Sequence, residues 1–128
     1  MDTNFLGAGI VFRTKDNKIL MLQKFNGKWS FPGGHRERGE TPILTAKREC
    51  IEELGQMPDG IISNAIPYIK SEDKKHCYSF IMDIKKKFEP TLSFEHKGYK
   101  WVKPKKVDDM NLSGAVEDLW PNLKRFLI

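Results

Sequence analysis

The chain has 128 residues and carries 22 Lys and Arg against 17 Asp and Glu, a formal net charge of +5. A chain of this size buries roughly two-thirds of the surface that it exposes when unfolded, so we expect one domain over residues 1–128. No run approaches the ~20 apolar residues of a membrane span, and two separated cysteines, Cys50 and Cys77, cannot form a disulfide framework, so we expect a cytoplasmic protein.

The first forty residues are typical of strands joined by turns. Runs rich in β-forming residues at 5–13 and 19–23, separated by the polar loop 14–18, predict an antiparallel hairpin. After a turn at 26–27, an aromatic strand is predicted at 29–31. Residues Pro32, Gly33 and Gly34 should then stop any regular element, so we expect a loop from there to Glu40.

A helix is predicted over residues 42–54. Thr41 suits the N-cap, Pro42 the first helical position and Gly55 the position just after the helix. Glu49, Glu52 and Glu53 fall on one arc, and the apolar residues fall on the opposite one: Ile43, Leu44, Ala46, Cys50, Ile51 and Leu54. We therefore expect one face of this helix to pack against the core and the other to present three carboxylates.

The second half of the chain predicts further strands and a last helix. Strands are expected at 61–70 and 76–84, with a short one at 98–102. Apolar residues recur at helical spacing between 116 and 127, although Pro121 must begin or kink that helix. The order of strands, helix, strands and helix indicates an α+β fold with a mixed sheet between helices.

The three glutamates of the first helix carry a specific chemical implication. Glu49, Glu52 and Glu53 stand at positions i, i+3 and i+4, so their side chains converge. Close like charges oppose folding, and a Mg²⁺ ion, which prefers oxygen ligands and substrate phosphates, would remove the conflict. The alternative is a solvated helix face on which Arg48 pairs with Glu52.

The segment 34–56, GHRERGETPILTAKRECIEELGQ, resembles the Nudix box, G-x5-E-x7-R-E-U-x-E-E-x-G-U, in which U is a bulky aliphatic residue. The two U positions depart from the pattern, with Cys50 and Gln56, and the latter suggests a local change in packing. The preceding WSFPGG and the later FEHKGYKWV also resemble family segments, and in the latter many members place a further glutamate, here Glu95. The seven fixed positions of the box are all matched: Gly34, Glu40, Arg48, Glu49, Glu52, Glu53 and Gly55.

The resemblance implies the Nudix fold, an α/β/α sandwich, and a MutT-like hydrolase of nucleoside diphosphates linked to another moiety. It implies that Arg48 orients Glu49, that Glu40, Gly34 and Gly55 order the box, and that the catalytic base is a carboxylate, Glu49, Glu52 or Glu95. The ligands that it implies for Mg²⁺, or for Mn²⁺, are four carboxylates and one carbonyl: Glu49, Glu52, Glu53, Glu95 and Gly33.

For the substrate, we expect a nucleoside triphosphate, including oxidised or non-canonical forms, cleaved to monophosphate and pyrophosphate. The chain is short and lacks the later Pro or Tyr that marks hydrolases of ADP-ribose or of dinucleoside tetraphosphates. Dinucleoside polyphosphates, nucleotide sugars and capped RNA stay open as alternatives. A non-catalytic nucleotide-binding module is a further alternative, although such proteins usually lose glutamates that this box keeps. Candidate substrate contacts, each with core packing or weak evidence against it, are Gln23, Phe25, Trp29 and Phe31.

The excess of positive charge suits a small anionic nucleotide. We expect no membrane partner, and no nucleic acid, because the lysine clusters lack interleaved aromatic residues. The protein is expected to be a monomer or a homodimer. His35, His76 and His96 have no metal-ligand spacing, and we expect His96 to be simply exposed.

Overall fold

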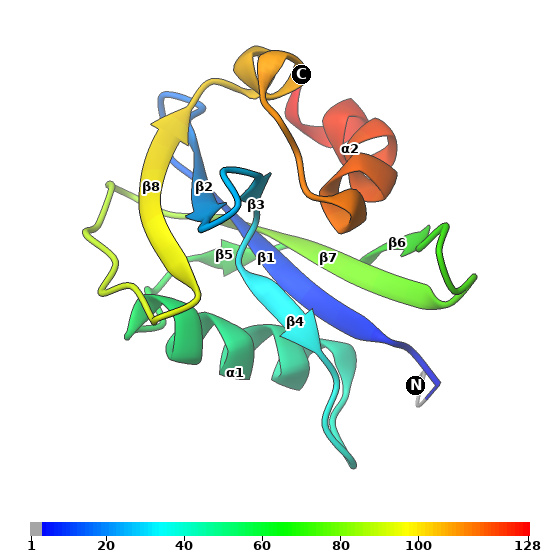
Figure 1. The fold of residues 1–128 in the computed structure, drawn as a ribbon. Coiled ribbons are helices and arrows are strands. Elements are labelled where there is room, and N and C mark those ends of the chain that lie inside the picture. Colours follow the sequence, from blue (N-terminus) through cyan, green and yellow to red (C-terminus); the bar gives the residue numbers. More distant parts are fainter. Residues whose placement is uncertain (1–3) are drawn as a thin grey trace.

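A mixed sheet runs through the centre of the computed structural model, which describes residues 4–128, with α1 on one face and α2 on the other (Figure 1). This confirms the α/β/α sandwich. The helices are α1 Pro42–Leu54, the 3₁₀ helix η1 Pro104–Asp109 and α2 Gly114–Leu127. The strands are β1 Gly7–Arg13, β2 Ile19–Lys24, β3 Trp29–Ser30, β4 Gly33–His35, β5 Ile61–Ile62, β6 Ile66–Ile69, β7 His76–Asp83 and β8 His96–Val102.

Strand β1 is the centre of the sheet. It pairs in parallel with β7 along its whole length, from Gly7 opposite Cys77 to Arg13 opposite Asp83, and antiparallel with the short β4. The expected hairpin with β2 exists, but its ladder is limited to the pair Arg13 and Ile19. From there β2 pairs with β3 and with β8, so β8 lies beside β2 at the opposite end of the sheet from β5 and β6.

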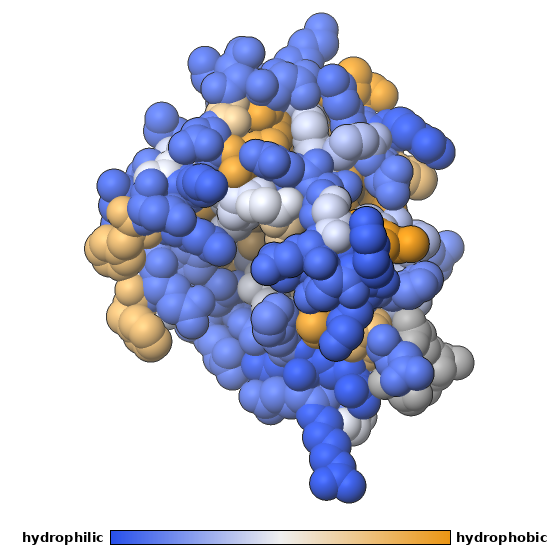
Figure 2. All heavy atoms as spheres, turned by 45° about the vertical axis from the view of Figure 1, so that its right-hand side comes forward, coloured by the Kyte–Doolittle hydropathy of each residue, from blue (hydrophilic) through white to orange (hydrophobic). Residues whose placement is uncertain are grey.

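Alternating side chains of the strands fill two apolar cores, one on each face of the sheet. On β1, Val11 belongs to the core under α2, whereas Ile10 and Phe12 belong to the core under α1. Hydrophilic side chains cover most of the face shown in Figure 2, where apolar ones form only small groups. Within residues 4–128, none of the helices combines the length and the apolar character needed to cross a membrane.

Helix α1 begins and ends at the predicted residues. The Thr41 hydroxyl accepts a hydrogen bond of 3.4 Å from the Leu44 amide, and Gly55 has the left-handed φ of 72° that favours glycine at this position. The expected division of its faces is wrong in part, because Leu44 and Ile51 are exposed and Glu53 is buried. The helix therefore brings one carboxylate into the protein instead of displaying all three.

Two of the strand predictions are also wrong. Residues 32–34 do not stop the sheet, because Gly33 and Gly34 enter β4, where a Cβ on Gly33 would lie 2.7 Å from the Cα of Gly9. Glycine thus permits a close antiparallel pair at this point. The expected strand 61–70 is two short strands, because an extra residue between Ile62 and Ile66 shifts the register against β7. Strand β8 begins at His96, earlier than expected.

Candidate metal and nucleotide site

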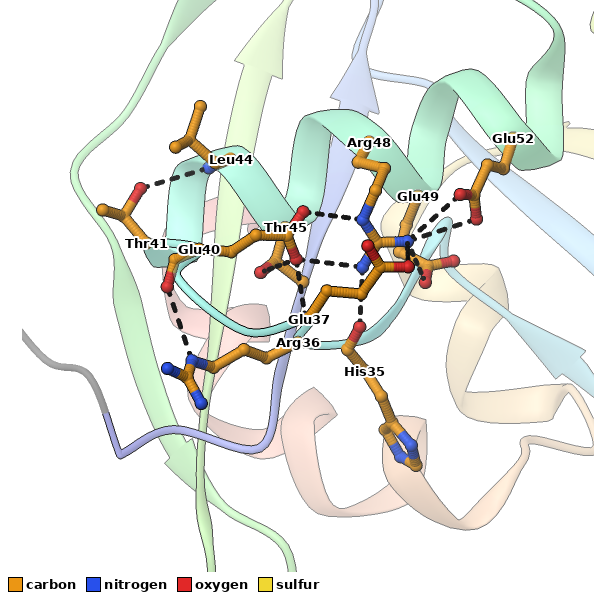
Figure 3. Close-up of polar contacts among 10 residues, drawn as sticks. All are labelled: His35, Arg36, Glu37, Glu40, Thr41, Leu44, Thr45, Arg48, Glu49 and Glu52. Atoms are coloured by element: carbon orange, nitrogen blue, oxygen red, sulfur yellow. Dashed lines mark hydrogen bonds and ion pairs between the residues drawn. The ribbon is translucent and has the colours of Figure 1, made fainter.

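The guanidinium of Arg48 joins the loop before α1 to the carboxylates of the helix (Figure 3). Its Nε and Nη2 donate to the two carboxylate oxygens of Glu40 at 2.7 and 3.0 Å. Nη2 also donates to the backbone carbonyl of His35 at 2.8 Å. On the other side, Nη1 donates to Oε1 of Glu49 at 3.0 Å and to Oε1 of Glu52 at 3.2 Å. One side chain therefore sets the positions of three glutamates.

Glu40 anchors the loop between β4 and α1. Besides Arg48, its Oε1 accepts hydrogen bonds from the Thr45 hydroxyl at 2.9 Å and from the Glu37 amide at 2.8 Å (Figure 3). The hydrogen bond from Arg48 is the main reason why the pKa of Glu40 falls to about 2, and the same contact raises the pKa of Arg48. The carboxylate of Glu40 is thus fully engaged in holding the loop.

Glu53 lies on the buried side of α1. Only 5% of its surface is exposed, and its Oε1 accepts a hydrogen bond of 2.7 Å from the Gly33 amide. Burial is the largest cause of a rise in its pKa to about 8, and the nearby charges of Glu49 and Glu95 act in the same direction. The Gly33 hydrogen bond and Lys24 oppose this rise. The site therefore concentrates negative charge that a cation would offset.

Glu95 and His96 reach Glu53 from the start of β8. Potential ligand atoms of these three residues all lie within 4.8 Å of one another. His96 Nε2 lies 3.7 Å from Glu53 Oε2, and burial lowers the pKa of the imidazole. The expectation that His96 is exposed is wrong, because β8 begins at this residue and pairs it with Lys24 of β2.

Glu49 lies between Arg48 and this group. A Cβ on Gly34 would stand 2.6 Å from both carboxylate oxygens of Glu49, so the carboxylate packs directly on the glycine backbone. Desolvation raises the pKa of Glu49, whereas the hydrogen bond from Arg48 lowers it. Glu52 is different, since 54% of its side chain is exposed and its described partner is Arg48. The four glutamates thus form a buried pair with Glu49 and Glu53 and an exposed pair with Glu52 and Glu95.

A cavity of about 250 Å³ opens beside Glu53 and Glu95 on the α2 side of the sheet. Its wall includes Gly33, Gly34 and His96, next to the acidic group. Two lysines, at the ends of β2 and β6, and two aromatic residues also line it: Lys24, Lys70, Phe31 and Tyr68. Positive charge, apolar rings and carboxylates in one cavity suit a nucleotide whose phosphates accompany a cation.

Among the expected substrate contacts, Phe31 lines this cavity and packs against Trp120, with ring centroids 6.3 Å apart. The other three lie outside its lining. The Gln23 amide donates to the Gly27 carbonyl at 3.2 Å, and the Trp29 ring carries the Lys100 ammonium 5.4 Å from its centroid. Phe25 is 65% exposed on the turn between β2 and β3.

Sequence reasoning missed Lys24, Lys70, Tyr68 and His96 as parts of the cavity wall. The available signal was their position, because Lys24 ends β2 and Lys70 directly follows β6. Nothing in the spacing of these residues, however, shows that the two strand ends meet at one cavity.

A family model described as "NUDIX domain" matches residues 3–126 of the chain. The chain is 33% identical over 110 residues to the bis(5'-nucleosyl)-tetraphosphatase [asymmetrical] of Sus scrofa, which covers 73% of this chain and 74% of that protein. It is 36% identical over 62 residues to the RNA pyrophosphohydrolase of Rickettsia bellii, but only 46% of this chain and 38% of that protein are covered. A crystal structure of a C. elegans Ap4A hydrolase binary complex superposes with a TM-score of 0.75 at 22% identity, over 94% of this chain and 97% of that one.

Proposed function

The chain belongs to the Nudix family of hydrolases, which act on phosphoanhydride bonds, and on that premise we propose that it cleaves a nucleoside triphosphate to a monophosphate and pyrophosphate. The observation that carries the proposal is the contact of the acidic group with the cavity. Glu53 and Glu95 line the same cavity as Lys24 and Lys70. The site thus has groups for a cation and groups for phosphates in one cavity.

The donors present fit a divalent cation. Glu49, Glu53 and Glu95 interact as like charges, and burial raises the pKa of Glu53 to about 8, so the unpaired carboxylates are unfavourable on their own. Mg²⁺ or Mn²⁺ would be held by Glu49, Glu52, Glu53 and Glu95, with the carbonyl of Gly33. A cation there supplies Lewis-acid polarisation and neutralises phosphate charge.

The residues of the chain divide the remaining work. Arg48 holds Glu49 and Glu52 in place, and Glu40 holds Arg48. Lys24 and Lys70 would attract the phosphates, while Phe31 and Tyr68 offer ring surfaces to the base. A carboxylate accepts the proton of the attacking water, and Glu49, Glu52 and Glu95 are the candidates.

A second candidate substrate is a bis(5'-nucleosyl) tetraphosphate. The relative from Sus scrofa, whose name specifies this activity, is 33% identical over 73% of the chain. A cavity of about 250 Å³ is slightly below the 300 Å³ or so at which drug-sized ligand sites begin, and therefore suits one nucleoside better than two. For this reason the triphosphate stays our first choice.

The test is product analysis with a nucleotide panel. The protein is incubated with Mg²⁺ and nucleoside triphosphates, bis(5'-adenosyl) tetraphosphate, nucleotide sugars or 5'-triphosphorylated RNA, and the products are separated by chromatography. We expect monophosphate and pyrophosphate from a triphosphate. Faster cleavage of the tetraphosphate, to a triphosphate and a monophosphate, would favour the second candidate, and no turnover of any of them would refute the proposal.

A further inference from the structure

His96 is an unusual neighbour for a group of carboxylates. It is 5% exposed, it lines the cavity, and its Nδ1 has no hydrogen-bond partner among the described residues. Its Nε2 lies 3.7 Å from Glu53 Oε2, which is beyond hydrogen-bond distance. Since buried polar groups are nearly always paired, no hydrogen bond of the described chain accounts for an imidazole here.

The backbone fixes this ring in place. His96 is the first residue of β8 and pairs with Lys24 of β2, and its amide donates to the Ser93 carbonyl at 3.4 Å. The Ser93 amide in turn donates to the Glu53 carbonyl at 3.3 Å, which ties the segment before β8 to α1. The imidazole and the Glu53 carboxylate are therefore held together by backbone contacts that do not depend on their side chains.

Their separation matches that of two ligands of one ion. Ligand atoms about 2.1 Å from a transition-metal ion lie at most about 4.2 Å apart, and the 3.7 Å between His96 Nε2 and Glu53 Oε2 falls within this limit. A carboxylate of Glu95 reaches the same point, since all three ligand atoms lie within 4.8 Å of one another.

We infer that His96 supplies a nitrogen ligand through Nε2, so that Glu53, Glu95 and His96 form a mixed nitrogen and oxygen site that selects Zn²⁺ or Co²⁺ over Mg²⁺. Imidazole favours such metals, whereas Mg²⁺ prefers oxygen ligands alone. This inference rests on the proposed function only in placing the cation in the same cavity. It distinguishes this chain from a site built of carboxylates, because the nitrogen makes the choice of metal a property of one residue.

The test measures metal binding without nucleotide. Isothermal titration of the metal-free protein with Zn²⁺ and with Mg²⁺ gives both affinities, for the wild type and for His96→Gln. We expect tighter binding of Zn²⁺ by the wild type, and a loss of about 10- to 100-fold in Zn²⁺ affinity in the variant, with a smaller effect on Mg²⁺. His76→Gln, which changes an exposed histidine at the start of β7, is the matched control and should bind both metals as the wild type does.

A direct measurement on the wild type does not depend on the folding of the variant. In an ¹⁵N spectrum of the imidazoles, one equivalent of Zn²⁺ should shift a ring nitrogen of His96 before those of His35 and His76. An unshifted His96, or equal losses of Zn²⁺ and Mg²⁺ affinity in His96→Gln, would overturn the inference. Because these readouts need no substrate, a Zn²⁺ site at His96 in a protein that cleaves no nucleotide would refute the proposed function and leave this inference standing.

Discussion

The carboxylate of Glu53 accepts a 2.7 Å hydrogen bond from the backbone amide of Gly33, which joins α1 to β4 at the wall of the cavity. The contact holds a nearly buried carboxylate at the end of a strand whose glycines allow close approach to β1. A backbone donor fixes the direction of this side chain without neutralising its charge. The charge therefore stays available to a cation.

Replacing this carboxylate should separate activity from stability. Glu53→Gln keeps an oxygen for the Gly33 amide but removes the buried charge, so we expect turnover with Mg²⁺ to fall by about a hundredfold or more. In the metal-free protein the same change removes an unfavourable buried charge, and the melting temperature should rise. Steady-state kinetics and calorimetry in EDTA test both parts. Near-normal turnover would remove Glu53 from the set of metal ligands.

The contact between Gly34 and Glu49 gives a second prediction. In Gly34→Ala the new methyl group would stand 2.6 Å from both carboxylate oxygens of Glu49 and must displace that side chain. Because the displaced atoms are the end of a flexible side chain, stability should change little while kcat falls about tenfold or more. Gly114→Ala is the control, since no atom lies within 4 Å of its Cβ, and it should retain full activity. Equal kcat in both variants would contradict the packing role.

Glu40 should stabilise the protein in a pH-dependent way. Its pKa is held at about 2 in the folded protein, against a usual value of 4.5, so the charged form stabilises the fold above about pH 4.5. This stabilisation is lost as the pH falls from 4.5 toward 2. Urea unfolding of wild type and Glu40→Gln should therefore show a larger difference at pH 7 than at pH 3.5. Glu72→Gln, at a largely exposed side chain, should show almost none at either pH. A Glu40→Gln difference independent of pH would refute the ion pair with Arg48 as its source.

Lys70 should act on substrate binding. It lines the cavity directly after β6, where its ammonium can meet phosphate. We expect Lys70→Ala to raise KM for a nucleoside triphosphate about tenfold, the equivalent of ~1.4 kcal/mol, with a smaller change in kcat. Lys86→Ala, in the segment after β7, leaves the cavity untouched and should have the wild-type KM. An unchanged KM in Lys70→Ala would place the phosphates elsewhere.

The local features of the chain could be predicted from the sequence, and its long-range contacts could not. Thr41, Pro42 and Gly55 determine where α1 starts and stops by short-range hydrogen bonding and backbone preference, and the structure agrees to the residue. The burial of Glu53 depends on Gly33, which lies twenty positions earlier and belongs to a strand that the glycines seemed to forbid. Helical spacing places three glutamates on one arc, but only the neighbouring strands determine which of them is buried.

The same limit applies to the site. The matched box positions identify Arg48 and its glutamates, because their spacing within one helix and one loop is local. His96 gave no such signal, since its approach to Glu53 depends on the register of β8 against β2. A polar residue next to a predicted catalytic glutamate is weak evidence until the strand that carries it is placed.

The parallel pairing of β1 with β7 has a consequence for refolding kinetics. Arg13 lies opposite Asp83, so this central ladder closes a long loop before most of the sheet can form. Sheets built from such distant segments fold slowly compared with helical bundles. Gly33, Glu53 and His96 meet only after β4, α1 and β8 have docked on this ladder. Recovery of catalytic activity after dilution from denaturant should therefore lag behind the recovery of helical circular dichroism.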